Sequence, residues 1–139
     1  MELISNRTEA DVLLGNEKGK YRSADLNRVE QAVAELCALA KPLDLYLKLE
    51  TRTDWGAPGM YSISNWPTDE QMQRYLSNVN QLCNAVSLDV GLPATMENLT
   101  WEGANQIERA LLCVETRIQS ILNTIRYSGE FYAGEENGL

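Results

Sequence analysis

The residues that could carry a reaction are few, and histidine is absent from all 139 positions. Its absence removes the commonest general base and the commonest metal ligand in proteins. A zinc site would have to use Cys37, Cys83 and Cys113, and no two of these have the Cys-x-x-Cys spacing of zinc-binding loops. We interpret all three as small core or near-core side chains, and their odd number argues against a disulfide framework. We therefore expect no metal and no other cofactor.

Paired carboxylates are the other candidate for catalysis, because they can share general acid and base roles. Glu108 and Glu115 share one face of a long helical pattern. A glycosidase or di-iron site needs carboxylates that converge from several elements, and the di-iron site also needs histidine. We interpret both glutamates as part of a solvated flank. Residues 15–19 lack the context of a phosphate-binding loop, so no segment predicts an enzyme.

The strongest pattern in the chain is an apolar stripe over residues 104–125. Its spacings alternate between three and four, which predicts one long helix packed against other helices. The stripe consists of Ala104, Ile107, Leu111, Val114, Ile118, Ile121 and Ile125. Thr100 is placed as its N-cap. Because Ser128 and Gly129 follow Tyr127, we predict that the helix ends near Tyr127.

Two further amphipathic segments complete a bundle. One runs from Ser23, its expected N-cap, to about Ala40. The other begins after Thr68 and continues to about Val86. Thr68 and Gln71 have the spacing of a capping box, in which side chain and backbone of the first turn bond reciprocally.

The chain also predicts a short N-terminal helix, from Glu9 to about Leu14, capped by Thr8 and ended by Gly15. Together these segments predict a mainly α protein, with residues 1–139 forming a single helical-bundle domain. We expect three long amphipathic helices, the short N-terminal helix and a small β-hairpin. Residues 128–139 are predicted to form an extended C-terminal tail.

The hairpin is predicted from a change of period. Leucines at 43, 45, 47 and 49 alternate with other residues, which is typical of a strand with one buried side. Residues 60–64 are its nearest partner. An open edge of such a hairpin could accept a strand from another subunit. Leu45, Leu47 and Leu49 are therefore candidate partner-contact residues.

Aromatic residues supply the other candidates for partner contact. Trp55 and Trp66 flank a loop with Tyr61 between them. They either seal one end of the bundle or form a contact surface for another protein or a glycan. The C-terminal candidates are Tyr127, Phe131 and Tyr132. This tail either folds back on its own bundle or reaches a neighbouring molecule.

The charge balance limits the partners. The chain has 20 acidic and 12 basic residues and a net charge of −8. Such a charge disfavours nucleic acid and anionic membranes, because both are polyanions. The sequence has no signal-peptide layout and no apolar stretch of membrane-spanning length, so we expect no membrane partner and a cytoplasmic location.

A set of short strings is distributed over nearly the whole chain. They are YRSADLNRVE at 21–30, TDW at 53–55, PT at 67–68 with MQRYL at 72–76, LP at 92–93, LTWEGANQIE at 99–108 and YSGE at 127–130. Together they resemble a family of small, uncharacterised prophage proteins of gut-associated Gram-positive bacteria. The resemblance implies a virion structural protein near the tail or baseplate, and it transfers no catalytic residue. Gly103 departs from the acidic residue expected early in that helix.

The sequence therefore favours a non-catalytic phage structural or assembly protein that acts through protein–protein contacts. Its expected partner is a second copy of itself or another phage structural protein, and it either stays in the host cytoplasm or enters the virion. The alternative is a phage-encoded acidic regulatory module that binds a host protein by mimicking nucleic acid. Clustering of acidic side chains on one face would favour the alternative, and scattered charge would not.

Overall fold

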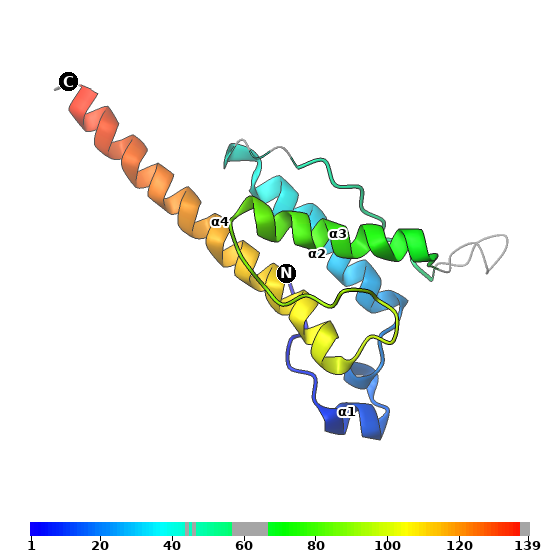
Figure 1. The fold of residues 1–139 in the computed structure, drawn as a ribbon. Helices are drawn as coiled ribbons and strands as arrows, with labels where there is room; N and C mark the ends of the chain where they lie inside the picture. The colour runs from blue at the N-terminus through cyan, green and yellow to red at the C-terminus, as the bar shows by residue number, and fades with distance from the viewer. Residues whose placement is uncertain (44, 46, 57–66, 137–139) are drawn as a thin grey trace.

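The computed structural model describes residues 1–43, 45, 47–56 and 67–136, and for residues 126–136 it describes the backbone alone. The helices of this part of the chain are α1 (Glu9–Leu14), α2 (Ser23–Leu39), α3 (Asp69–Ala85) and α4 (Trp101–Glu136). Two short 3₁₀ helices, η1 (Glu17–Gly19) and η2 (Lys41–Leu43), follow α1 and α2. The mainly helical class predicted from the sequence is confirmed (Figure 1).

The predicted helix starts agree with the structure at three of four positions. Thr8 caps α1 and Thr68 caps α3, each with a reciprocal capping box. The Thr100 hydroxyl accepts a hydrogen bond from the Gly103 backbone N–H at 3.0 Å at the start of α4. At α2 the prediction is wrong, because Arg22 is the N-cap and Ser23 is already helical. The Asp25 carboxylate accepts the Arg22 backbone N–H at 2.7 Å, which is the bond that the N3 residue makes in a capping box.

The core lies between α2, α3 and α4. It is built from their apolar faces, and its most deeply buried members are Val29, Val33, Leu36, Tyr75, Val79, Leu82, Ile107, Leu111, Val114 and Ile118. Each fully buried aliphatic side chain of this kind contributes about 1.5–3 kcal/mol. The stripe on α4 is therefore the central seam of the bundle as far as Ile118.

Helix α4 does not end near Tyr127, as the sequence predicts, but continues to Glu136. The expected extended tail is therefore wrong for residues 128–136, while 137–139 lie outside the described residues. A helical glycine costs about 1 kcal/mol relative to alanine. Each residue added to an existing helix still gains a backbone hydrogen bond, so one glycine does not stop propagation. In Figure 1 the C-terminal part of α4 projects away from the other helices.

The predicted hairpin is also wrong within the described part of the chain, which contains no strand. Leu45, Leu47 and Leu49 are half-buried and pack against the core along an irregular segment. The Glu50 carbonyl accepts hydrogen bonds from the side chains of Arg74 and Asn78 of α3. Side chains of α3 thus satisfy the backbone carbonyl at Glu50, where a neighbouring strand would otherwise donate. Residues 60–64, the proposed second strand, lie outside the described residues.

Candidate functional site

Four charged side chains meet where the N-terminal segment contacts α2 and α4: Arg7, Asp25 and Glu108 are buried and Arg28 is half-buried, and we call them the N-terminal charge cluster. Glu108 is fully buried, and its two carboxylate oxygens bind Arg7 at 2.6 Å and Arg28 at 2.7 Å. Asp25 binds Arg28 at 2.6 Å and Arg7 at 3.3 Å. Two cations therefore balance two anions, which removes most of the cost of burying each charge.

The burial of Glu108 corrects the interpretation of this residue as part of a solvated flank. It lies four residues after Ala104 and three before Leu111, so it shares the buried face of α4. That spacing was a usable signal in the sequence. The partner Arg7, however, lies 101 residues away in the chain, and no local pattern indicates that pairing. Glu115 is half-buried.

The N-terminal segment is fastened to α4 by its backbone as well. The side-chain amide of Asn105 accepts the Arg7 N–H at 3.0 Å and donates to the Arg7 carbonyl at 2.9 Å. Glu108 accepts the Ile4 N–H at 3.0 Å, and Arg109 donates to the Ser5 carbonyl at 3.2 Å. We call residues 4–7 the N-terminal strap, because side chains of α4 hold its backbone along the helix.

A second buried cluster joins α2, α3 and the segment before residue 57. Glu30 of α2 binds Arg74 of α3 at 2.6 Å and also accepts a hydrogen bond from the indole of Trp55. The Asn27 side chain accepts the Trp55 backbone N–H at 2.9 Å and donates to its carbonyl at 3.0 Å. The Arg52 guanidinium lies 4.0 Å from the centre of the indole. Trp55 is thus a sealed core residue.

The buried hydroxyl groups of Tyr21 and Tyr75 and the buried thiol of Cys83 are held in forms that are poorly suited to catalysis. The hydroxyls of Tyr21 and Tyr75 bond to each other, and burial raises the pKa of both above the ordinary tyrosine value. Burial, with a smaller effect of nearby Cys113, raises the pKa of Cys83 to about 11. At neutral pH this thiol is therefore protonated and a weak nucleophile. Within the described residues, no cluster of three or more Cys, Asp or Glu side chains could hold a metal ion.

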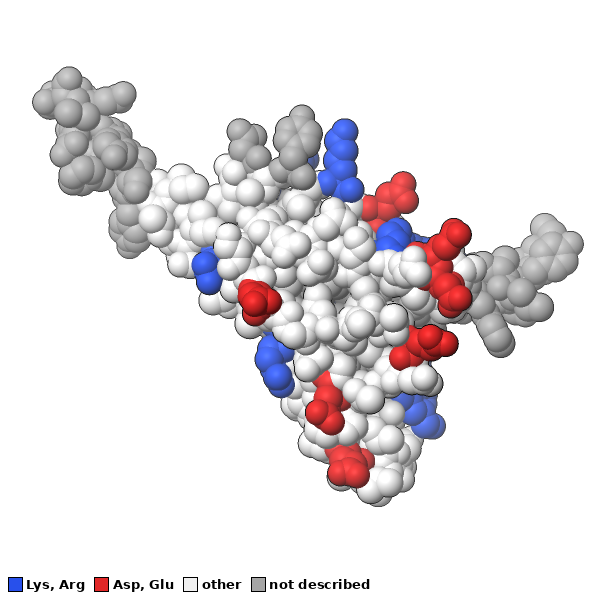
Figure 2. All heavy atoms as spheres, in the orientation of Figure 1, with Lys and Arg blue, Asp and Glu red and all other residues white. Residues whose placement is uncertain are grey.

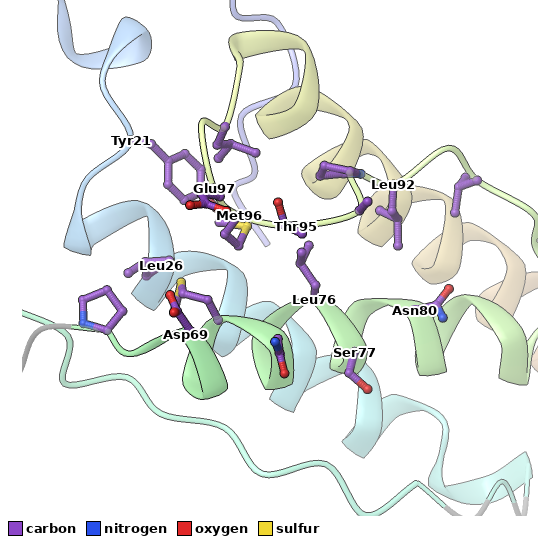
Figure 3. Close-up of a pocket in the computed structure, with 17 residues that line it drawn as sticks. Tyr21, Leu26, Asp69, Leu76, Ser77, Asn80, Leu92, Thr95, Met96 and Glu97 are labelled. Atoms are coloured by element: carbon purple, nitrogen blue, oxygen red, sulfur yellow. The ribbon is translucent and has the colours of Figure 1, made fainter.

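A groove of about 910 Å³ runs between α3 and the loop before α4 (Figure 3). Its apolar side chains come from α2, α3 and this loop, and they include Leu26, Met72, Leu76, Leu92, Met96 and Leu99. Asp69 and Glu97 supply the charges, and no Lys or Arg is among the lining residues. We call this feature the α3 groove.

Exposed apolar side chains gather at two other places. On α1, Val12, Leu13 and Leu14 are 45%, 80% and 78% exposed, and we call them the α1 apolar surface. On α4, Ile121 is half-buried and Ile125 is 51% exposed, so the stripe reaches solvent beyond Ile118. Within the described part of the chain, no helix is sufficiently long and apolar to cross a bilayer.

The structure places the predicted contact residues in different surroundings. Trp55 is buried, whereas the leucines at 45, 47 and 49 cover the core with part of their surface. The backbone of α4 carries Tyr127, Phe131 and Tyr132. Tyr61 and Trp66 lie outside the described residues. The sequence interpretation missed the α1 apolar surface, whose signal was an apolar run on a helix too short to bury it.

Comparisons with known proteins add no relative to these observations. No protein-family model matches the chain, and no curated protein or solved structure is significantly similar to it. The functional argument therefore depends on the residues and contacts described above.

Proposed function

We propose that this chain is a non-catalytic structural or assembly protein of a phage, associated with the tail or baseplate, that works through protein–protein contacts. One observation carries the proposal. The apolar stripe of α4 fills the core as far as Ile118, packs partly against it at Ile121 and is exposed at Ile125. An exposed continuation of a packing seam is a surface suited to another protein.

The length of α4 supports the same conclusion. Residues 119–136 would extend about 27 Å at the usual helical rise. Most helical stability in proteins comes from packing of an apolar face, and at Ile125 that face is exposed. Contact with another chain would cover Ile125 and stabilise this part of α4 at the same time. We therefore expect the projecting part of α4 to be a contact element.

The buried polar groups support a non-catalytic role. Both charge clusters pair carboxylates with guanidinium groups inside the fold, and the charged groups that line the α3 groove are Asp69 and Glu97. General acid and base catalysis needs a titratable group that reaches the substrate. Fully paired carboxylates such as Glu108 instead fix how the helices and the N-terminal strap fit together.

The phage assignment depends on the resemblance of the short strings. Several residues of the two charge clusters belong to these strings: Asp25, Arg28, Glu30, Trp55, Arg74 and Glu108. The strings therefore contain most of the charged residues of the two clusters, although Arg7 lies outside them. This is why the resemblance supports a common architecture as well as a common role.

The alternative, an acidic module that mimics nucleic acid, has less support. On the face seen in Figure 2, Asp and Glu side chains form separate small groups, and Lys and Arg side chains lie among them. Mimicry of a polyanion would need a continuous acidic surface. We therefore retain the structural role as the proposed function.

Incorporation into particles tests this proposal. Virions would be purified from a lysogen that encodes the chain, and their proteins quantified by mass spectrometry. We expect the wild-type chain at a fixed ratio to a known tail protein, and a strongly reduced ratio for Ile125→Glu. Asn123→Glu is the matched control, because Asn123 is an exposed neighbour outside the apolar stripe. Recovery of the wild-type chain only in the soluble fraction would contradict the proposal.

A further inference from the structure

Helix α1 is capped at both ends although none of its residues is buried. Thr8 and Asp11 form its capping box, and Gly15 ends it with a φ of 64°, in the left-handed region that favours glycine. The Asn16 side chain donates to the Asp11 carboxylate at 2.8 Å. A Cβ atom at Gly19 would lie 2.1 Å from the Asp11 carbonyl oxygen, so only glycine allows η1 to pack this closely.

The position of α1 is fixed from outside as well. Arg7 directly precedes its cap, and the N-terminal charge cluster holds Arg7 against α2 and α4. The chain therefore ties the start of a six-residue helix to the core and leaves the apolar side chains of that helix in water. Exposure of Leu13 and Leu14 gains nothing for the stability of the isolated chain. This arrangement is expected of a preformed docking element, because preorganisation lowers the entropic cost of binding.

The α3 groove has the complementary properties. Its floor is apolar, and its charged side chains are the carboxylates of Asp69 and Glu97 (Figure 3). An apolar segment with a cation beside it would match this groove. At the C-terminal end of α1, the Lys20 side chain lies 3.8 Å from the Cβ position of Gly15, the residue that follows Leu14. Glu9 and Asp11 lie in the first turn, at the opposite end of the helix, and Glu17 and Lys18 lie in η1.

We propose that the α1 apolar surface of one copy docks into the α3 groove of a second copy, with Lys20 facing Asp69 and Glu97. The inference rests on the proposed function and names a second copy of the chain as one partner. The two surfaces differ, so the contact is heterologous, and each copy can donate one α1 and accept another. Contacts of this kind generate rings when the rotation closes and helical filaments when it does not.

A heterologous contact has a distinctive signature in a mixing experiment, measured by sedimentation velocity over a range of concentrations. Leu13→Glu places a charge in the α1 apolar surface, and Ser77→Lys places a long cation in the groove from an exposed position on α3. Circular dichroism checks that both variants fold. Gln106→Glu, at an exposed position on α4, is the matched control.

We expect the wild-type chain and the control to form species above the 15.6 kDa monomer as concentration rises. Each interface variant alone should remain monomeric. An equimolar mixture of Leu13→Glu and Ser77→Lys should form a 1:1 dimer and nothing larger, because one intact groove and one intact α1 remain in the mixture.

Three results would overturn the inference: a wild-type chain that is monomeric at every concentration, association that persists in Leu13→Glu, or a mixture that stays monomeric. Persistence in Leu13→Glu would mean that copies associate through another surface, which leaves the proposed function intact. If association depends on α1 but the chain is absent from purified virions, the proposed function is contradicted and the contact between copies is supported.

Discussion

Arg7 and Glu108 form an ion pair at 2.6 Å between residues 101 positions apart in the chain, and both side chains are almost completely buried. This pair joins the start of the chain to the N-terminal part of α4, the longest of the described helices. Arg28 and Asp25 complete a neutral set around it. The pair thereby fixes both the N-terminal strap and the α1 helix that follows it.

Removal of one charge from this set should destabilise the fold strongly. We expect Glu108→Gln to lower the free energy of unfolding by about 3–5 kcal/mol, because the buried Arg7 and the half-buried Arg28 would then face one carboxylate. Glu115→Gln, at a half-buried site on the same helix, should change it by less than about 0.5 kcal/mol. Chemical denaturation measures both values. Equal effects of the two substitutions would show that the N-terminal charge cluster does not stabilise the fold.

The N-terminal strap gives a separate prediction. Asn105→Ala removes the partner of both backbone groups of Arg7 and should cost about 1–3 kcal/mol. Hydrogen exchange of the Arg7 amide should accelerate, while the amides of α3 should keep their protection relative to global unfolding. Gln106→Ala, at the adjacent exposed position, is the control. Unchanged exchange at Arg7 would contradict this assignment.

Buried hydroxyls and thiols predict a loss of stability at alkaline pH. Burial raises the pKa of Cys83 from 9.0 to about 11, and it raises the pKa of Tyr21 and Tyr75 above 10.0. A raised folded-state pKa gives stability that is complete below the unfolded-state pKa and is lost as pH rises through the folded-state pKa. Stability should therefore be constant near neutrality and fall above about pH 9.

Ultraviolet difference spectroscopy measures this titration directly. The two tyrosines should ionise only together with unfolding, and the alkaline transition of Tyr21→Phe should lose part of that signal. Ionisation of both tyrosines near pH 10 in a chain that stays folded would rule out the buried hydroxyl pair.

Thiol reactivity should follow exposure. Cys113 is exposed, Cys37 is half-buried and Cys83 is buried, so the prediction of three core or near-core cysteines is wrong for Cys113. Alkylation followed by mass spectrometry should label Cys113 first, Cys37 more slowly and Cys83 only on unfolding. In Cys113→Ser the fast phase should vanish and the slower phases should remain. Rapid labelling of Cys83 would contradict the packing of α3 against α4.

Local signals allowed much of the fold to be predicted from the sequence. The caps at Thr8, Thr68 and Thr100 depend on residues within one helical turn, and all three are correct. The hairpin prediction failed within the described residues because it depends on distant residues. The side chains of Arg74 and Asn78 donate hydrogen bonds to the Glu50 carbonyl. A period of two indicates that one side of the segment is buried. It does not indicate which groups form hydrogen bonds with the backbone of the segment.

The candidate site was less accessible to prediction. Glu108 could be placed on the buried face by its spacing, but its neutralisation by Arg7 depends on the tertiary fold. The exposure of Leu13 and Leu14 depends on which elements cover α1, and sequence spacing does not determine that. Local chemistry thus predicts the helices, and long-range pairing decides which surfaces remain open.

The central claim is that apolar side chains left outside the core make contacts between copies of this chain. Hydrogen exchange of the wild-type chain, compared between dilute and concentrated solution, tests this claim most directly. The account predicts that residues 9–14 and the loop at 88–99 gain protection together at high concentration, while α2 is unchanged. Identical exchange at both concentrations in every segment would contradict it.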